Sequence, residues 1–135
     1  MILNAGDINW ALDLAERCYK RELDRDAWRK WIIRNLENPN FLILRGDHSI
    51  VVAAMQPKLP DFVEWEGMFP YWMSDGSECA AELVALFRGA LRWMKNHNVR
   101  TVWLKPTTGV DASPLAKVLG FQKSYPSFSK DLCDA

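Results

Sequence analysis

The chain has 135 residues, of which 49% are hydrophobic and 25% are charged, so its composition predicts a single ordered globular domain over residues 1–135. Its 17 basic and 17 acidic side chains balance, which argues against electrostatic binding to nucleic acid or to a membrane surface. No apolar run reaches the roughly 20 residues that span a bilayer, and the N-terminus lacks the pattern of a signal peptide. The three cysteines and two histidines show no metal-binding spacing, so we expect reduced thiols, no metal site and a cytoplasmic protein.

The first part of the chain predicts a short strand, two helices and a hairpin. Residues 1–4 are a short apolar start. Apolar residues then recur at steps of three and four, which predicts an amphipathic helix over 8–22 with Asp7 as its N-cap. A second helix begins after Asp24 or Asp26 and ends at the sequence Asn-Pro-Asn, residues 38–40. Two apolar runs, 41–44 and 50–55, flank a Gly-Asp turn and predict a β-hairpin.

The second part of the chain predicts a mixed sheet with helices on its faces. A strand is expected over 62–73, and Gly67 and Pro70 within it predict a bulge or a split in the strand pairing. The longest helix is expected over 77–96, with a buried stripe made of Ala80, Leu83, Phe87, Leu91 and Met94. Three further elements complete the chain: a strand over 99–104, a short helix over 111–119 and one or two strands over 121–132. This order of elements predicts an α/β fold.

The element order and the segment ASPLAKVLGF resemble the GNAT superfamily of acyl-CoA N-acyltransferases. The segment is similar to the GNAT pattern Asn-x-x-Ala-x-x-Leu-Tyr-x-x-Leu-Gly-Phe, and the matching residues are Ala112, Leu115, Leu119, Gly120 and Phe121. The resemblance covers essentially the whole chain and implies a GNAT-like mixed, splayed β-sheet with helices on both faces. It also implies an N-acetyltransferase that moves an acetyl group from acetyl-CoA to a small-molecule or protein amine.

The chain departs from this family at positions that carry chemistry. Ala116 stands where GNATs have the tyrosine that often protonates the leaving thiolate, and Gly109 stands at the asparagine position. The turn WMSDGSECAAEL, residues 72–83, aligns with the signature Arg/Gln-x-x-Gly-x-Gly/Ala, but only Ala80 fits, because Asp75 takes the basic position and Glu78 the glycine position. Such a degenerate signature is similar to small phage-encoded GNAT-like proteins. The alternative function is therefore a non-catalytic binding or structural protein in the host cytoplasm or the virion.

The same turn is the candidate site for the cofactor. The N-terminus of a helix holds anions, since free N–H donors and the helix dipole point there. The resemblance therefore assigns acetyl-CoA binding to Met73, Ser74, Gly76, Ser77 and Ala80. A carboxylate about 5 Å from a phosphate costs roughly 3 kcal/mol at an effective dielectric constant of about 20, so Asp75 and Glu78 oppose binding unless Arg88 or Lys105 supplies a cation. The same acids also suit a ligand-free turn in which Asp75 or Ser77 caps the helix and Glu78 favours the helix dipole, and both interpretations stay open.

The candidate catalytic residues lie on the predicted strand over 62–73. Glu64 and Glu66 alternate along it and are expected to face the same side. The resemblance implies that a glutamate on this strand takes the proton of the amine, and Glu66 is favoured because it is nearer the Gly67 break, with Glu64 in support. Tyr71 is the candidate to replace the missing tyrosine. Alternatively, the two acids keep an edge soluble and Tyr71 is a half-buried packing residue.

The chain contains seven tryptophans, spread over nearly every predicted element. Either they pack in the core and on half-buried surface, or those near the first two helices form an exposed cluster. An exposed cluster would predict a protein partner or a homodimer.

Overall fold

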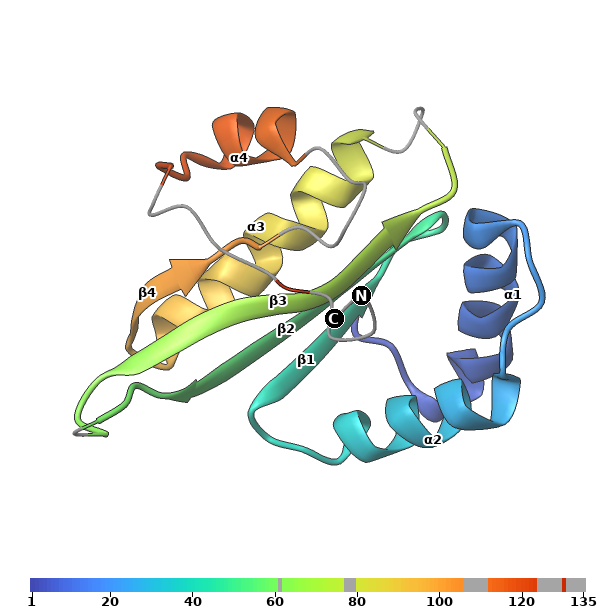
Figure 1. The fold of residues 1–135 in the computed structure, drawn as a ribbon, viewed down its shortest axis with the longest axis horizontal. Coiled ribbons are helices and arrows are strands. Elements are labelled where there is room, and N and C mark those ends of the chain that lie inside the picture. Colours follow the sequence, from blue (N-terminus) through green and yellow to red (C-terminus); the bar gives the residue numbers. More distant parts are fainter. Residues whose placement is uncertain (61, 77–79, 106–111, 124–129, 131–135) are drawn as a thin grey trace.

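A four-stranded sheet separates α1 and α2 from α3 and α4 in the structure, which is a computed structural model (Figure 1). The structure describes residues 1–60, 62–76, 80–105, 112–123 and 130. The helices are α1 (Ile8–Tyr19), α2 (Arg25–Leu36), α3 (Ala80–Asn96) and α4 (Ser113–Leu119), and a short 3-10 turn, η1 (Ala5–Asp7), precedes them. The strands are β1 (Phe41–Arg45), β2 (Ser49–Pro57), β3 (Trp65–Ser74) and β4 (Val99–Trp103). Most of the strand region expected over 121–132, and residues 77–79 of the predicted long helix, lie outside the described residues.

The sheet is mixed, as the sequence predicted. Its order is β1-β2-β3-β4; β2 is antiparallel to both β1 and β3, whereas β4 is parallel to β3. Pairing between β3 and β4 ends where Met68 lies opposite Trp103, although β3 continues to Ser74. Strand β4 itself ends at Trp103, so among the described residues β3 continues beyond Met68 with no strand beside it on this side, which is the open edge that a splayed sheet requires.

A bulge interrupts the pairing of β2 with β3 at the predicted place. Met68 pairs with Ala54 and Tyr71 pairs with Val52, so that Phe69 and Pro70 together lie opposite Ala53. Proline suits this position because it has no N–H group to offer a neighbouring strand. Because of the extra residue, the side chains after the bulge point to the opposite face from the one that regular alternation would give them.

The bulge brings residues from both halves of β3 onto one face. Phe69 packs with the buried residues on the α3 side of the sheet, whereas Tyr71 and Met73 pack with those on the α1–α2 side. Side chains alternate along a strand, so Glu66 and Met68 lie on the face opposite Phe69. The face toward α1 and α2 therefore carries Glu66, Met68 and Tyr71.

Two apolar clusters hold the layers together. On the α1–α2 side the buried residues include Leu12, Leu14, Ala15, Ile32, Ile43, Ile50 and Val52. On the α3–α4 side they include Leu44, Val51, Ala53, Phe69, Leu86, Phe87, Ala90 and Met94. The strands β1 and β2 contribute to both clusters, so the sheet is buried on both faces at its centre.

Several predictions from local signals are confirmed. Asp24 caps α2 by accepting a hydrogen bond from the N–H of Ala27 at 3.1 Å. Strands β1 and β2 form the predicted hairpin. Gly120 ends α4 in the left-handed region with φ of 79°, which glycine adopts without the steric cost of a Cβ.

Other local predictions need correction. The strand expected over 1–4 is a single bridge between Ile2 and Leu44, because the chain turns into η1 immediately afterwards. Asp7 precedes α1 but does not cap it; its side chain instead accepts from the N–H of Asn4 and pairs with Arg45. Helix α1 ends at Tyr19 rather than at residue 22, since Lys20 has a left-handed backbone with φ of 52°.

Two longer elements also differ from their predicted form. The predicted stripe of α3 is confirmed except at its start: Phe87 and Met94 are buried and Leu83 and Leu91 pack against the same cluster, whereas Ala80 is exposed. Strand β3 begins at Trp65 instead of residue 62, and Phe62, in the preceding loop, has a positive φ of 59° that is incompatible with a strand.

Candidate active site

The carboxylate of Glu66 is held by one donor from each neighbouring strand. Glu66 lies opposite Gln56 of β2 and Thr101 of β4. Gln56 Nε2 donates to Oε1 at 2.9 Å, and Trp103 Nε1 donates to Oε2 at 3.1 Å. Two neutral donors thus fix the direction of the carboxylate, which is the kind of support that a general base needs.

Glu64 does not join this arrangement. It precedes β3, so the alternation that was expected to align it with Glu66 does not reach it. Its carboxylate instead pairs with Arg100 Nη1 at 3.1 Å, and the two side chains are 43% and 77% exposed. The structure therefore places Glu64 in a surface ion pair.

Two adjoining clefts lie on the face of the sheet that carries Glu66. The first has a volume of about 470 Å³ and is lined by Gln56, Glu66, Met68, Phe69, Pro70, Trp103 and Lys105. The second has a volume of about 330 Å³ and is lined by Ala27, Trp28, Trp31, Pro70 and Tyr71. Pro70, at the bulge, contributes to both, so the bulge lies where the two clefts meet.

Tyr71 lines the second cleft and packs in a cluster of aromatic rings. Its ring centroid is 5.1 Å from that of Trp28, and the Trp28 and Trp31 centroids are 6.1 Å apart; both contacts are edge-to-face. Its hydroxyl forms a hydrogen bond with the hydroxyl of Tyr19. Burial, and then the hydrogen bond with Tyr19, raise the pKa of Tyr71 far above its usual value of 10.0, so this phenol stays protonated in neutral solution.

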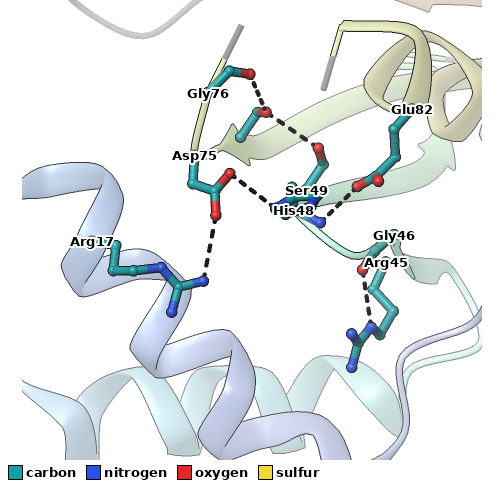
Figure 2. Close-up of polar contacts among 9 residues, drawn as sticks. Arg17, Arg45, Gly46, His48, Ser49, Asp75, Gly76 and Glu82 are labelled. Atoms are coloured by element: carbon teal, nitrogen blue, oxygen red, sulfur yellow. Dashed lines mark hydrogen bonds and ion pairs between the residues drawn. The ribbon is translucent and has the colours of Figure 1, made fainter. Parts of the chain in front are cut away.

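The turn between β3 and α3 carries Asp75, whose carboxylate lies between Arg17 and His48 (Figure 2). Asp75 Oδ2 lies 3.4 Å from a guanidinium nitrogen of Arg17 on α1, and Oδ1 lies 3.3 Å from Nδ1 of His48 in the β1–β2 turn. The Asp75 side chain is only 20% exposed. Asp75 thus links three elements that are distant in the sequence.

A second carboxylate lies at the same end of the sheet. Glu82, in the first turn of α3, accepts a hydrogen bond from the backbone N–H of His48 at 2.8 Å (Figure 2). A phosphate that approached the start of α3 would therefore meet Asp75 and Glu82. Glu78, the other acid of the turn, lies outside the described residues.

The predicted cofactor residues occupy different environments. The Ser74 hydroxyl accepts from Ser49 Oγ and donates to the carbonyl of Gly76, both at 3.3 Å. A Cβ built on Gly76 would meet no atom within 4 Å, so its backbone is open to an approaching group. Met73 is buried in the α1–α2 cluster and Ala80 is exposed, whereas Ser77 lies outside the described residues.

Sequence reasoning missed most partners of Glu66 and Tyr71. Gln56 and Trp103 reach Glu66 through the register of β2 and β4, and Trp28 reaches Tyr71 through the packing of α2. The one available signal was the spacing of Trp28 and Trp31, which places them on one helix face. Lys105, considered as a phosphate cation, lines the Glu66 cleft instead, and Arg88 is exposed on α3.

All seven tryptophans are half-buried, which agrees with the first alternative, packing in the core and on half-buried surface, and not with an exposed cluster near the first two helices. A protein partner or homodimer through tryptophan stays a prediction.

Within the described residues, no three His, Cys, Asp or Glu side chains are grouped as a metal site would require. In that same part of the chain, no helix has the length and apolar character needed to cross a membrane.

Comparison by sequence finds no relative: no protein family matches the chain, and no curated protein matches it. Solved structures do match. An aminoglycoside 6′-N-acetyltransferase from Acinetobacter haemolyticus has a TM-score of 0.74 at 15% identity, over 98% of this chain and 97% of that one. A predicted acetyltransferase from Clostridium acetobutylicum, solved with acetyl-CoA, has a TM-score of 0.72 at 12% identity, over 100% of this chain and 96% of that one.

A third match carries a different name. A transcriptional regulator from Bacillus halodurans has a TM-score of 0.75 at 10% identity, over 98% of this chain and 97% of that one. Since all three identities are low, the matches establish architecture and not activity. The chain therefore has the mixed, splayed α/β fold of the GNAT acetyltransferases.

Proposed function

We propose that this protein is an N-acetyltransferase that moves an acetyl group from acetyl-CoA to a small-molecule or protein amine. The observation that carries the proposal is the Glu66 carboxylate, held by Gln56 and Trp103 in a cleft beside the point where β4 leaves β3. An amine attacks a thioester only after it has lost a proton, so the site needs a base in such a position. The acetyltransferase names among the structural neighbours support the same chemistry.

The edge of β3 beyond Met68 fits the cofactor's extended arm. Among the described residues, no strand pairs with β3 on the β4 side between Phe69 and Ser74. A strand edge offers N–H and C=O groups to an extended chain that carries amides, such as the pantetheine arm of CoA. When bound, acetyl-CoA supplies the activated acetyl group. The phosphate end fits less well, because Asp75 and Glu82 lie at the start of α3.

The residues of the chain then divide the work. Glu66 receives the proton of the ammonium group, directly or through a water molecule. The Tyr71 hydroxyl is bonded to Tyr19 and its pKa is raised, so we assign it no proton transfer; its ring lines the second cleft. Glu64 takes no part in the proposed reaction, because its carboxylate pairs with Arg100 on the surface.

The test is acetyl transfer by Glu66→Gln, with Glu64→Gln as the matched control. Loss of a general base costs about 10²–10⁴-fold in rate, so Glu66→Gln should lower turnover at least about a hundredfold and leave acetyl-CoA affinity nearly unchanged. Glu64→Gln, in an exposed ion pair, should stay within about threefold of the parent. A thermal-shift measurement with acetyl-CoA and with free CoA checks folding and binding in the same samples.

Two outcomes would contradict the proposal. Turnover of Glu66→Gln within a few-fold of the parent would remove Glu66 from the mechanism. Absence of turnover in the parent, over a panel that includes aminoglycosides, polyamines, arylalkylamines and peptide N-termini, would leave the non-catalytic alternative suggested by the degenerate signature. The same panel distinguishes small-molecule from protein acceptors.

A further inference from the structure

The second cleft, between α2 and the bulge of β3, has aromatic walls that the fold holds in place. Trp28 lies between Trp31 and Tyr71, with edge-to-face contacts at interplanar angles of 69° and 67°. The hydroxyl of Tyr71 is held by Tyr19, and Trp28, Trp31 and Tyr71 all pack partly against the buried α1–α2 cluster. Rings held in this way form a preorganised surface for a flat apolar group.

The two adjoining clefts carry few charged side chains. Among the described residues that line them, the charged side chains are one carboxylate, Glu66, and one ammonium, Lys105. Lys105 Nζ lies 5.6 Å from the ring centre of Trp103, which itself donates to Glu66. One ammonium group can therefore pair with Glu66, whereas a second one in the same cleft meets the like charge of Lys105.

The distance between the Glu66 carboxylate and the aromatic wall at Tyr71 determines how long the ligand must be. Glu66 and Tyr71 are five positions apart on β3, which a strand covers in about 15 Å before the side chains are considered. The clefts meet at Pro70, between these two residues. A ligand that fills both must therefore be elongated, with its charge separated from its apolar body.

We infer that the acceptor is an elongated amine with a single ammonium group and an aromatic or other flat apolar body. The body lies against Trp28, Trp31 and Tyr71, and the ammonium group points along the cleft toward Glu66. This inference rests on the proposed acetyl transfer, whose acceptor it specifies. It excludes short polar amines and amines with several charges as preferred acceptors.

The experiment measures binding and turnover separately on the intact protein. Isothermal titration calorimetry with a series from benzylamine to phenylhexylamine measures affinity in the absence of acetyl-CoA. A coupled assay with acetyl-CoA measures kcat/KM for the same amines, and butylamine and kanamycin complete the panel. We expect affinity and kcat/KM to increase with spacer length and to pass through a maximum beyond phenethylamine. At the maximum, the phenylalkylamine should bind at least about tenfold more tightly than butylamine, because it buries a phenyl ring.

Variants connect the preference to the cleft. Trp28→Phe keeps a ring but loses part of the aromatic wall, and should weaken phenylalkylamine binding about three- to tenfold while leaving butylamine binding unchanged. Trp93→Phe is the matched control, since Trp93 is half-buried on α3 and packs against the other cluster. Trp93→Phe should change the affinity for neither the phenylalkylamine nor butylamine. The amine series needs no variant, so it decides the inference even if Trp28→Phe proves unstable.

The outcomes separate this inference from the proposed function. Binding with the expected preference but without turnover would support the amine site and contradict acetyl transfer. Turnover of amines with no dependence on the aromatic body or the spacer would support acetyl transfer and overturn the inference. Tighter binding or faster turnover of kanamycin than of any phenylalkylamine would overturn it as well.

Discussion

Asp75 is the residue that the resemblance aligns with the basic position of the GNAT signature, and its carboxylate pairs with Arg17. Arg17 and His48 approach its two carboxylate oxygens from α1 and from the β1–β2 turn. Because Arg17 is paired with Asp75, it is not available to pair with a phosphate that approaches the turn. Asp75 is therefore expected to lower the affinity for CoA.

Asp75→Asn should tighten CoA binding by about three- to tenfold. A unit negative charge about 5 Å from a phosphate costs roughly 3 kcal/mol at an effective dielectric constant of about 20, and solvent screening together with the Arg17 pair reduces this to about 0.7–1.4 kcal/mol. Stability should fall by no more than about 1 kcal/mol, because Arg17 is 53% exposed and such pairs contribute little. Calorimetric titration with CoA and urea unfolding measure the two effects.

Asp26→Asn is the control for this substitution. Asp26 pairs with Arg29 on α2, its side chain is 86% exposed, and it lies in another part of the molecule. It should change CoA affinity by less than about twofold. If Asp75→Asn loses stability but gains no affinity, the acid has a structural role only and the turn does not hold phosphate.

At the same scale, the sequence identified the acids but not their partners. Glu66 could be chosen because few carboxylates lie near the Gly67 break. Its two donors depend on strand register: Gln56 reaches it across the β2–β3 connection, and Trp103 reaches it from a parallel strand that follows a complete helix. A shift of one residue in either register would turn these side chains to the other face, and no local pattern fixes that register.

The bulge in β3 is the element that determines the geometry of the site. Gly67 and Pro70 marked it in the sequence because both residues weaken regular strand pairing. Its consequence was not predictable: the exchange of faces moves Tyr71 to the side that carries Glu66. Helix ends marked by capping residues were likewise predictable, whereas the left-handed Lys20 that ends α1 has no local signal.

Gly67→Ala should destabilise the protein by about 1–3 kcal/mol, the usual cost of overpacking a filled core. A Cβ at this position would lie 2.6 Å from Sδ of Met94, which is 1% exposed, and 3.3 Å from Cγ1 of Val99. The buried Met94 side chain would have to move, and the Val99 side chain would have to give by a few tenths of an ångström. The free energy of urea unfolding measures the cost.

Gly89→Ala on α3 is the matched control, and its expected sign is opposite. The nearest atom to its Cβ would be Cδ1 of Leu44 at 3.4 Å, which is an ordinary contact. Alanine favours the helix over glycine by about 0.5–1 kcal/mol, so this variant should be more stable than the parent. Equal stability of Gly67→Ala and the parent would show that Met94 has room to move and that this layer is loosely packed.

For the whole molecule, the resemblance in sequence was weak and the architecture was nevertheless predictable. The element order and the apolar periodicities determine which faces are buried, and these patterns persist at identities of 10–15% with the solved structures. The site was less predictable, because it forms where α2, β2, β3 and β4 meet. Tyr71 lies at this junction, so the effect of its ionisation on the free energy of unfolding is a property of the whole molecule.

The stability of the whole molecule should fall as the pH rises above 10. Burial and the Tyr19 hydrogen bond raise the pKa of Tyr71 above its unfolded value of 10.0, so the folded protein keeps a proton that the unfolded chain loses. The stabilisation is therefore fully present below pH 10 and is lost as the pH increases. One such proton corresponds to about 1.4 kcal/mol at one pH unit above 10, and partial solvent exposure reduces this to about 0.5–1 kcal/mol.

Tyr71→Phe removes this ionisation and keeps the ring that contacts Trp28. Below pH 9 it should be slightly less stable than the parent, because the hydrogen bond to Tyr19 is lost. Above pH 10 its free energy of unfolding should fall less steeply, so that the two curves converge. Cys18, whose pKa is also raised by burial from 9.0, is present in both proteins, and its charge is the smallest of the causes that raise the pKa of Tyr71. Urea unfolding at intervals between pH 8 and about 11 gives both curves, and curves that remain parallel would show that Tyr71 ionises as readily in the folded protein as in the unfolded chain.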